Sequence, residues 1–146
     1  MIAIGSDHAG FKLKEHIKDL LNSKGLEFKD FGCFDENSVD YPDISEAVSN
    51  AVAAGECEKG ILICGTGIGM SIVANKVNGV RAALCSDTFS ARFTRLHNDA
   101  NVLCMGARVL GEGLAADIAE IFLDTPFEGG RHERRVNMIS EVEKRN

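Results

Sequence analysis

Short apolar runs alternate with longer amphipathic stretches along this chain. Four of the runs are almost wholly apolar: Met1–Ile4, Gly60–Cys64, Val80–Cys85 and Val102–Met105. Such runs are typical of strands that are covered on both faces of a sheet. A fifth run, Leu26–Phe31, alternates apolar and charged residues, and it predicts an edge strand with one wetter face.

The stretches between these runs repeat their apolar residues every three or four positions, which predicts amphipathic helices. Gly25 is predicted to end the first helix, since glycine is common just after a helix. Pro42 suits a first helical turn, and Asp87 suits an N-cap. A last helix is predicted over about Glu133–Lys144. Strand and helix alternate five times, which favours a single α/β domain with a parallel sheet between two helical layers. The apolar stripes begin at Leu13, Ile44, Ile68, Phe89, Leu114 and Val136.

The composition is that of a single-domain soluble protein. The 146 residues suit one domain, 1–146, and the hydrophobic share of 45% with 26% charged residues is ordinary for a soluble protein. No apolar run approaches the ~20 residues of a membrane span, and the N-terminus does not resemble a signal peptide. The net charge of −6 argues against nucleic acid or an anionic membrane as a partner. The five cysteines lack disulfide or zinc spacing, which favours free thiols in a reducing cytoplasm.

Ligands of parallel α/β sheets bind outside the carboxyl ends of the strands, so the residues after each run are the candidates for function. Asp7 and His8 follow the first run. A carboxylate beside an imidazole can position substrate hydroxyls or move protons. The alternative is that Asp7 or Ser6 caps the next helix and that His8 is merely exposed.

A glycine-rich loop, Cys64–Met70, follows the third run. Its alternate glycines allow the backbone to approach an anion closely. Met70 stands where a dinucleotide fingerprint needs glycine and where a tyrosine-phosphatase loop needs arginine, and no P-loop lysine follows. A helix start beside Cys64 favours the thiolate, so Cys64 is a candidate base or nucleophile. The alternative is a buried, inert cysteine, as we expect for the other four.

Basic groups gather late in the chain. His97, at a predicted helix end, is a candidate general acid or a simple capping element. Arg108 follows the fifth run, and Arg131 and Arg135 are four residues apart, so that on a helix they could clamp one phosphate. Residues 131–146 carry five positive and three negative charges, which leaves −8 on the rest of the chain. A solvated basic tail is the alternative.

Five motifs together resemble the B-type ribose-5-phosphate isomerases, in the larger family that includes the galactose-6-phosphate isomerase subunits. The motifs are Ser6–Gly10, Val39–Asp43, Cys64–Met70, His97–Asn101 and Gly129–Arg135. The resemblance covers essentially the whole chain. It implies a three-layer α/β/α sandwich around a five-stranded, Rossmann-like parallel sheet, without metal or cofactor. It also implies a cytoplasmic homodimer or tetramer whose active sites are shared, with the C-terminal helix reaching a partner subunit.

The resemblance also implies roles for single residues. One branch of the family uses a cysteine before the glycine loop as the base, and another uses a glutamate after the third glycine. This chain has Cys64 in the first place and Met70 in the second. His97 would open the sugar ring with help from Asp7, and Thr66 would relay a proton between substrate oxygens. The substrate-binding groups would be Asp7, His8, Tyr41, Gly65, Thr66, Gly67, Ile68, Gly69, Asn98, Arg108, Arg131 and Arg135.

The expected reaction interconverts D-ribose 5-phosphate and D-ribulose 5-phosphate through a cis-enediolate, a step of the pentose phosphate pathway. Two alternatives stay open on the sequence alone. One is an isomerase that prefers a six-carbon sugar phosphate, such as allose 6-phosphate or galactose 6-phosphate. The other is a non-catalytic phosphate-binding module on the same framework.

Overall fold

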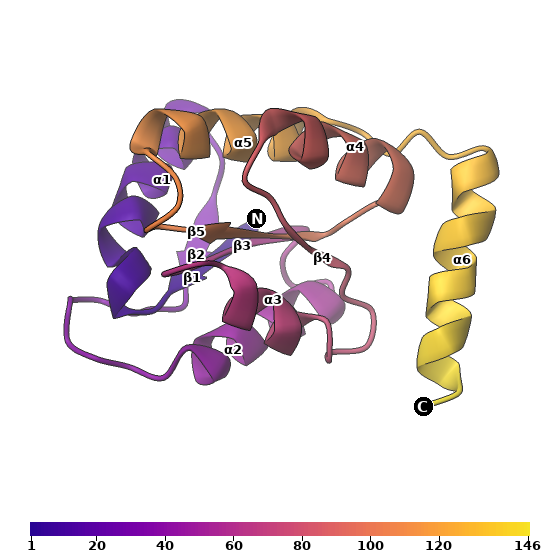
Figure 1. The fold of residues 1–146 in the computed structure, drawn as a ribbon, viewed down its shortest axis with the longest axis horizontal. Helices are drawn as coiled ribbons and strands as arrows, with labels where there is room; N and C mark the ends of the chain where they lie inside the picture. The colour runs from indigo at the N-terminus through magenta and orange to yellow at the C-terminus, as the bar shows by residue number, and fades with distance from the viewer.

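A computed structural model describes residues 1–146 and contains one five-stranded sheet in which all strands are parallel (Figure 1). The strand order is β2-β1-β3-β5-β4, which confirms the predicted α/β class. The observed strands differ from the predicted runs by a few residues at their ends. They are β1 (Ile2–Ser6), β2 (Phe28–Asp30), β3 (Lys59–Cys64), β4 (Ala82–Leu84) and β5 (Val102–Gly106).

Six α-helices connect or follow the strands. They are α1 (Phe11–Ser23), α2 (Tyr41–Ala53), α3 (Ile68–Ala74), α4 (Thr88–Asn98), α5 (Glu112–Asp124) and α6 (Arg131–Lys144). α1, α4 and α5 cover one face of the sheet, and α2 and α3 cover the other (Figure 1). The three-layer sandwich is therefore confirmed.

Local sequence signals explain most helix ends. Pro42 lies in the first turn of α2, and the Asp87 carboxylate accepts a hydrogen bond of 2.6 Å from the Ser90 N–H at the start of α4. Gly25 has a φ of +67° just beyond α1, where glycine is favoured. The apolar stripe that begins at Ile68 runs on to Val77, but α3 ends at Ala74 because the chain turns there toward β4.

The core lies in two apolar layers, one on each side of the sheet. Alternate residues of the central strand β3 face opposite layers: Ile61 and Ile63 pack with α1, α4 and α5, whereas Leu62 and Cys64 pack with α2 and α3. Both faces of β3 are thus dry, as its nearly continuous apolar sequence predicts. Phe122 of α5 is the largest fully buried apolar side chain.

The α6 helix stands at one end of the molecule, beyond the edge strand β4, and belongs to neither helical layer, although its first turn packs against the end of α4 (Figure 1). A cavity of about 460 Å³ separates α6 from the body. Large apolar side chains are exposed on β4 and on the helices α3, α4 and α6: Ile68, Ile72, Leu84, Phe89, Met138, Ile139 and Val142. None of the helices combines the length and the apolar character that crossing a membrane requires.

Candidate active site at the carboxyl edge of the sheet

Three predicted site segments meet at the carboxyl edge of the sheet. β1 and β3 are neighbours in register, with Ser6 opposite Ile63, so Asp7 and Cys64 leave adjacent strands side by side. Arg108 follows β5 and lies across the glycine loop, where its Nη1 would be 3.3 Å from a Cβ placed on Gly65. The topology therefore brings together residues that are up to about a hundred positions apart in sequence.

The Cys64 thiol lies at the end of β3, almost buried, and its Sγ accepts a hydrogen bond of 3.1 Å from the Gly67 N–H. Gly67 has a φ of +80°, and a Cβ there would lie 2.8 Å from the Met105 carbonyl carbon, so glycine is required. The turn thus points a backbone donor at the sulfur. This hydrogen bond holds the sulfur in place at the end of the strand, beside the glycine loop.

The remainder of the loop offers further polar groups. The Thr66 hydroxyl accepts a hydrogen bond of 3.2 Å from the Ile68 N–H and is exposed, so its own proton is free to be donated. Tyr41, at the start of α2, packs against Gly69, where a Cβ would lie 2.5 Å from its ring. Gly69 therefore leaves the space that the Tyr41 ring occupies.

The other cysteines differ from Cys64 in their surroundings. Burial raises the pKa of the Cys85 thiol to about 11, and burial also raises the pKa values of Cys57 and Cys104. Cys33 is buried, and its thiol donates a hydrogen bond to the Asp35 carbonyl at 3.2 Å. These four side chains fill the interior, as the sequence predicts.

Asp7 and His8 have structural partners as well as a place at this edge. The Asp7 carboxylate accepts a hydrogen bond of 3.1 Å from the Gly10 N–H and so caps the short 3-10 turn His8–Gly10. This is the capping role that the sequence left open as an alternative. His8 Nδ1 accepts a hydrogen bond of 3.2 Å from the Val39 N–H, which leaves its Nε2 to carry the ring proton. His8 can therefore donate from Nε2 to an anion.

His97 and Asn98 lie at the opposite edge of the same sheet. They end α4, and the Asn98 carbonyl accepts a hydrogen bond of 3.0 Å from Arg81 Nε, just before β4 begins. The Gly60 N–H, near the start of β3, donates to the Asn101 carbonyl beside them at 2.9 Å. Cys64 is four residues further along β3, a distance of about 13 Å at ~3.3 Å per residue. One chain therefore does not bring His97 to Cys64.

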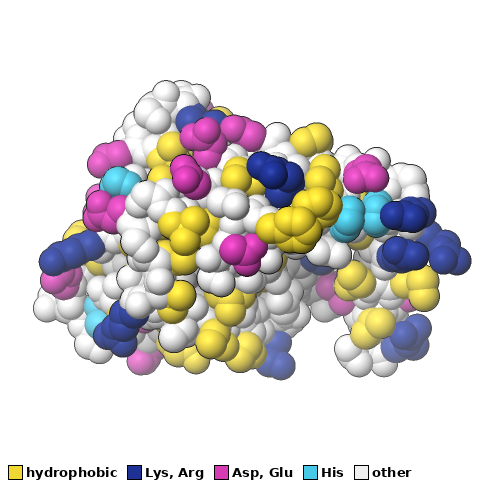
Figure 2. Space-filling model, turned by 45° about the horizontal axis from the view of Figure 1, so that its top comes forward, with side chains coloured by type: hydrophobic (Ala, Val, Ile, Leu, Met, Phe, Trp, Pro, Cys, Tyr) yellow, Lys and Arg dark blue, Asp and Glu magenta, His cyan; other side chains and the backbone are white.

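The predicted phosphate clamp also lies at this far edge. Arg131 and Arg135 are exposed in the first turns of α6, one helical turn apart as predicted. Between them on the same helix, His132 is buried and stacks on His97, with ring centroids 4.0 Å apart and planes 12° from parallel. Figure 2 shows this pair of histidines beside the basic side chains at the α6 end of the molecule. The predicted site residues thus form two groups, one at each edge of the sheet.

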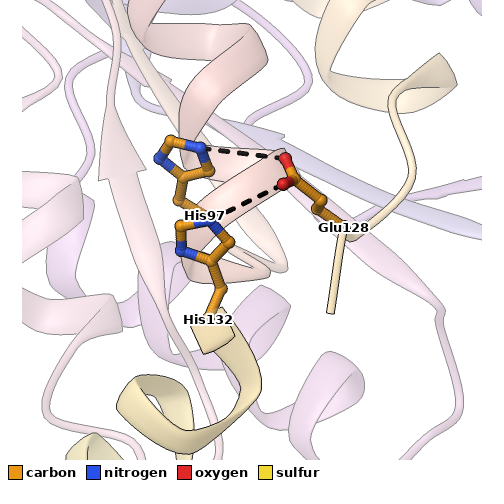
Figure 3. Close-up of side chains that lie close together, drawn as sticks. All are labelled: His97, Glu128 and His132. Carbon is orange, nitrogen blue, oxygen red and sulfur yellow. Dashed lines mark ion pairs between the residues drawn. The ribbon is translucent and has the colours of Figure 1, made fainter. Parts of the chain in front are cut away.

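Sequence reasoning missed the surroundings of His97. Glu128, in the loop before α6, lies beside both rings, with carboxylate oxygens 3.9 Å from His97 Nε2 and 3.8 Å from His132 Nε2 (Figure 3). Buried Arg95 donates to the Asp99 carboxylate at 2.8 Å and anchors the end of α4. The i, i+4 spacing of Glu128 and His132 was the only signal in the sequence, and it does not point to His97.

Comparisons with known proteins agree with the fold and with the sequence motifs. The chain is 49% identical to ribose-5-phosphate isomerase B of Escherichia coli over 144 residues, which is 99% of this chain and 97% of that protein. It is 48% identical to D-erythrulose-4-phosphate isomerase of Pectobacterium atrosepticum over 145 residues, 97% of this chain and 94% of the other. The structure of Clostridium thermocellum ribose-5-phosphate isomerase B superposes with a TM-score of 0.97 at 53% identity, covering 99% and 97% of the two chains.

These relatives match the chain over almost its whole length, and the matching family model agrees with them. That model is described as Ribose/Galactose Isomerase, and it covers residues 2–139. The chain therefore belongs to the ribose/galactose isomerase family and is an isomerase.

Proposed function

We propose that this isomerase interconverts D-ribose 5-phosphate and D-ribulose 5-phosphate, with Cys64 as the base. The observation that carries the proposal is the Cys64 Sγ at the open edge of the sheet, held 3.1 Å from the Gly67 N–H within a glycine loop. The names of relatives at 49% and 53% identity support the same reaction.

The chemistry follows from the groups at this edge. Once the sugar is open, the Cys64 thiolate takes the proton from C2, and the electron pair forms the C1–C2 double bond while O1 gains negative charge. Backbone N–H groups of the Gly65–Gly69 loop other than those of Gly67 and Ile68 stabilise that oxygen, and donors of this kind contribute roughly 3–4 kcal/mol each. The Thr66 hydroxyl passes a proton between O1 and O2. Cys64 then returns its proton to C1, which completes the ketose.

The substrate phosphate is held away from the reacting carbons. Arg108 lies beside Gly65, and His8 donates from Nε2 because its Nδ1 is already hydrogen-bonded to the backbone. Arg131 and Arg135 add two charges when α6 of a second copy reaches this edge. Binding energy from the phosphate then positions the carbons for reaction.

A second copy of the chain also supplies His97 as the ring-opening acid and Asn98 as a sugar contact. His97 must be within about 3 Å of the ring oxygen to protonate it, and in one chain the width of the sheet separates it from Cys64. The exposed apolar side chains around β4 and α6 are the surface that we assign to this dimer. The working unit is then a homodimer with two shared sites.

The test is turnover of ribose 5-phosphate with EDTA present, by wild type and by Cys64→Ala. Loss of the base should reduce kcat by at least ~100-fold, because general base catalysis contributes this much. Cys85→Ala is the matched control, since Cys85 is also a buried cysteine at a strand end and should leave kcat unchanged. Equal rates for wild type and Cys64→Ala would reject Cys64 as the base.

Four-carbon and six-carbon sugars are the second candidates. The 48% identity to a D-erythrulose-4-phosphate isomerase is the specific observation in favour of a shorter substrate. Measuring kcat/KM for ribose 5-phosphate, erythrulose 4-phosphate, allose 6-phosphate and galactose 6-phosphate decides among them. The proposal requires the highest value for ribose 5-phosphate.

A further inference from the structure

His97, Glu128 and His132 form a cluster of three metal-ligand types outside the Cys64 site (Figure 3). Each residue offers one potential ligand atom, an imidazole nitrogen or a carboxylate oxygen, and these three atoms all lie within 4.8 Å of one another. The three residues come from the end of α4, the loop before α6, and the first turn of α6. The cluster therefore exists only because α6 packs its first turn against α4.

The His132 ring lacks a partner for one of its polar atoms. Its side chain is 5% exposed, and its Nε2 is buried without a hydrogen bond. A buried, unpaired nitrogen is uncommon, and it faces the Glu128 carboxylate in the same cluster. Burial, followed by the nearby His97, lowers the pKa of His132.

We propose that His97, Glu128 and His132 bind one Zn²⁺ ion and that this ion inhibits the enzyme. Two imidazoles and one carboxylate are a ligand set that suits Zn²⁺, with water as the fourth ligand. Bonds of ~2.0–2.2 Å in a tetrahedron place ligand atoms roughly 3.4 Å apart. His97 Nε2 lies 3.9 Å from one carboxylate oxygen of Glu128, and His132 Nε2 lies 3.8 Å from the other, so each separation is slightly longer than the one required. The stacked rings splay by side-chain rotation to direct both lone pairs at the ion.

Inhibition follows from the atom to which the ion binds. Zn²⁺ on His97 Nε2 takes the position of the proton that His97 gives to the sugar ring oxygen, so the cyclic substrate stays closed. Glu128 is largely exposed, which gives the ion a path from solvent. The binding of Zn²⁺ depends only on the cluster, whereas the inhibition rests on the proposed function of His97.

Binding is measured by competition between the full-length protein and a chromophoric zinc chelator. We expect one Zn²⁺ per chain, bound at least ~10-fold more weakly by Glu128→Gln and by His132→Gln than by wild type. His16→Gln is the matched control. The Nδ1 atom of His16 lies 3.6 Å from a carboxylate oxygen of Glu112, but this pair has no third metal-ligand residue beside it. Co²⁺ in place of Zn²⁺ should give the intense visible absorption of a four-coordinate site, and both variants should lose it. Circular dichroism verifies that each variant is folded.

Several results would overturn the site. Unchanged zinc affinity in both Glu128→Gln and His132→Gln would place the ion elsewhere, and a loss of affinity in Cys64→Ser would identify the thiol as that place. Inhibition is measured as the zinc dependence of ribose 5-phosphate turnover, with reversal by EDTA. If wild type converts ribose 5-phosphate and zinc binds the cluster without lowering that rate, the inhibitory role is refuted. A wild type without turnover would instead reject the proposed function, and the binding measurements would still decide the site.

Discussion

Complementation between two inactive variants tests whether each active site is built from two chains. The perturbation is a pair of single substitutions, Cys64→Ala and His97→Asn, on chains that carry different affinity tags. Each variant alone should be inactive, because it lacks either the base or the ring-opening acid at every site. Co-expression followed by purification on both tags gives a heterodimer with one chain of each kind.

The expected magnitude follows from the positions of the two residues in the fold. Cys64 ends β3, whereas His97 lies beside the start of that strand, about 13 Å away at ~3.3 Å per residue. In a symmetric dimer with shared sites, one site of the heterodimer contains both substitutions and the other contains neither. The heterodimer should therefore have about half of the wild-type kcat per dimer.

The assay is conversion of ribose 5-phosphate to ribulose 5-phosphate, followed by the absorbance of the ketose. A matched control pairs Cys64→Ala with Arg108→Ala, two substitutions on the same edge of the sheet. That heterodimer has one altered residue in each site, so its activity should stay near that of the variant homodimers. A Cys64→Ala/His97→Asn heterodimer no more active than its parents would refute the shared site.

Three further predictions concern the fold that supports this site. Gly67→Ala should lower both stability and kcat, because φ is +80° and the new Cβ would lie 2.8 Å from Met105 backbone; thermal melts and kinetics measure this. Phe122→Ala should lower the free energy of unfolding by about 3–5 kcal/mol in urea titrations, since the ring is fully buried. Burial alone would raise the pKa of Asp30, but hydrogen bonds from Lys14 and its neighbours hold it below the ordinary value. Its stabilisation is complete above the unfolded-state pKa and fades as pH falls through the lower pKa of the folded state. The urea midpoints of wild type and Asp30→Asn should therefore converge as pH falls below about 4.

The proposed dimer gives the basic C-terminal segment a function. The net charge of −6 combines an acidic body with a basic C-terminal segment, and the structure places that segment on α6 at one end of the molecule (Figure 1). A helix that presents arginines to a second copy can hold a phosphorylated sugar without attracting polyanions to the whole surface. The proposed dimer explains both the projecting helix and its charge.

Local sequence determined the layout of the elements and one of the two groups of proposed site residues. Apolar runs such as Gly60–Cys64 can be satisfied only where both faces of a strand are covered, so they specify a parallel sheet with two helical layers. Because parallel strands present their carboxyl ends at one edge, the residues that follow them, Asp7, Cys64 and Arg108, could be placed together without coordinates. Strand and helix ends were less certain, since Val77 continues an apolar stripe beyond the end of α3.

Only the tertiary structure decided where His97 lies and what surrounds it. The helical period puts His97 at the end of α4, but the direction of that helix across the sheet places it at the edge opposite Cys64. Its neighbours Glu128 and His132 are more than thirty residues further along the chain, and packing of α6 against α4 brings them within reach. Contacts between segments so far apart leave no periodic trace in a single sequence, because they depend on how whole elements pack rather than on local spacing.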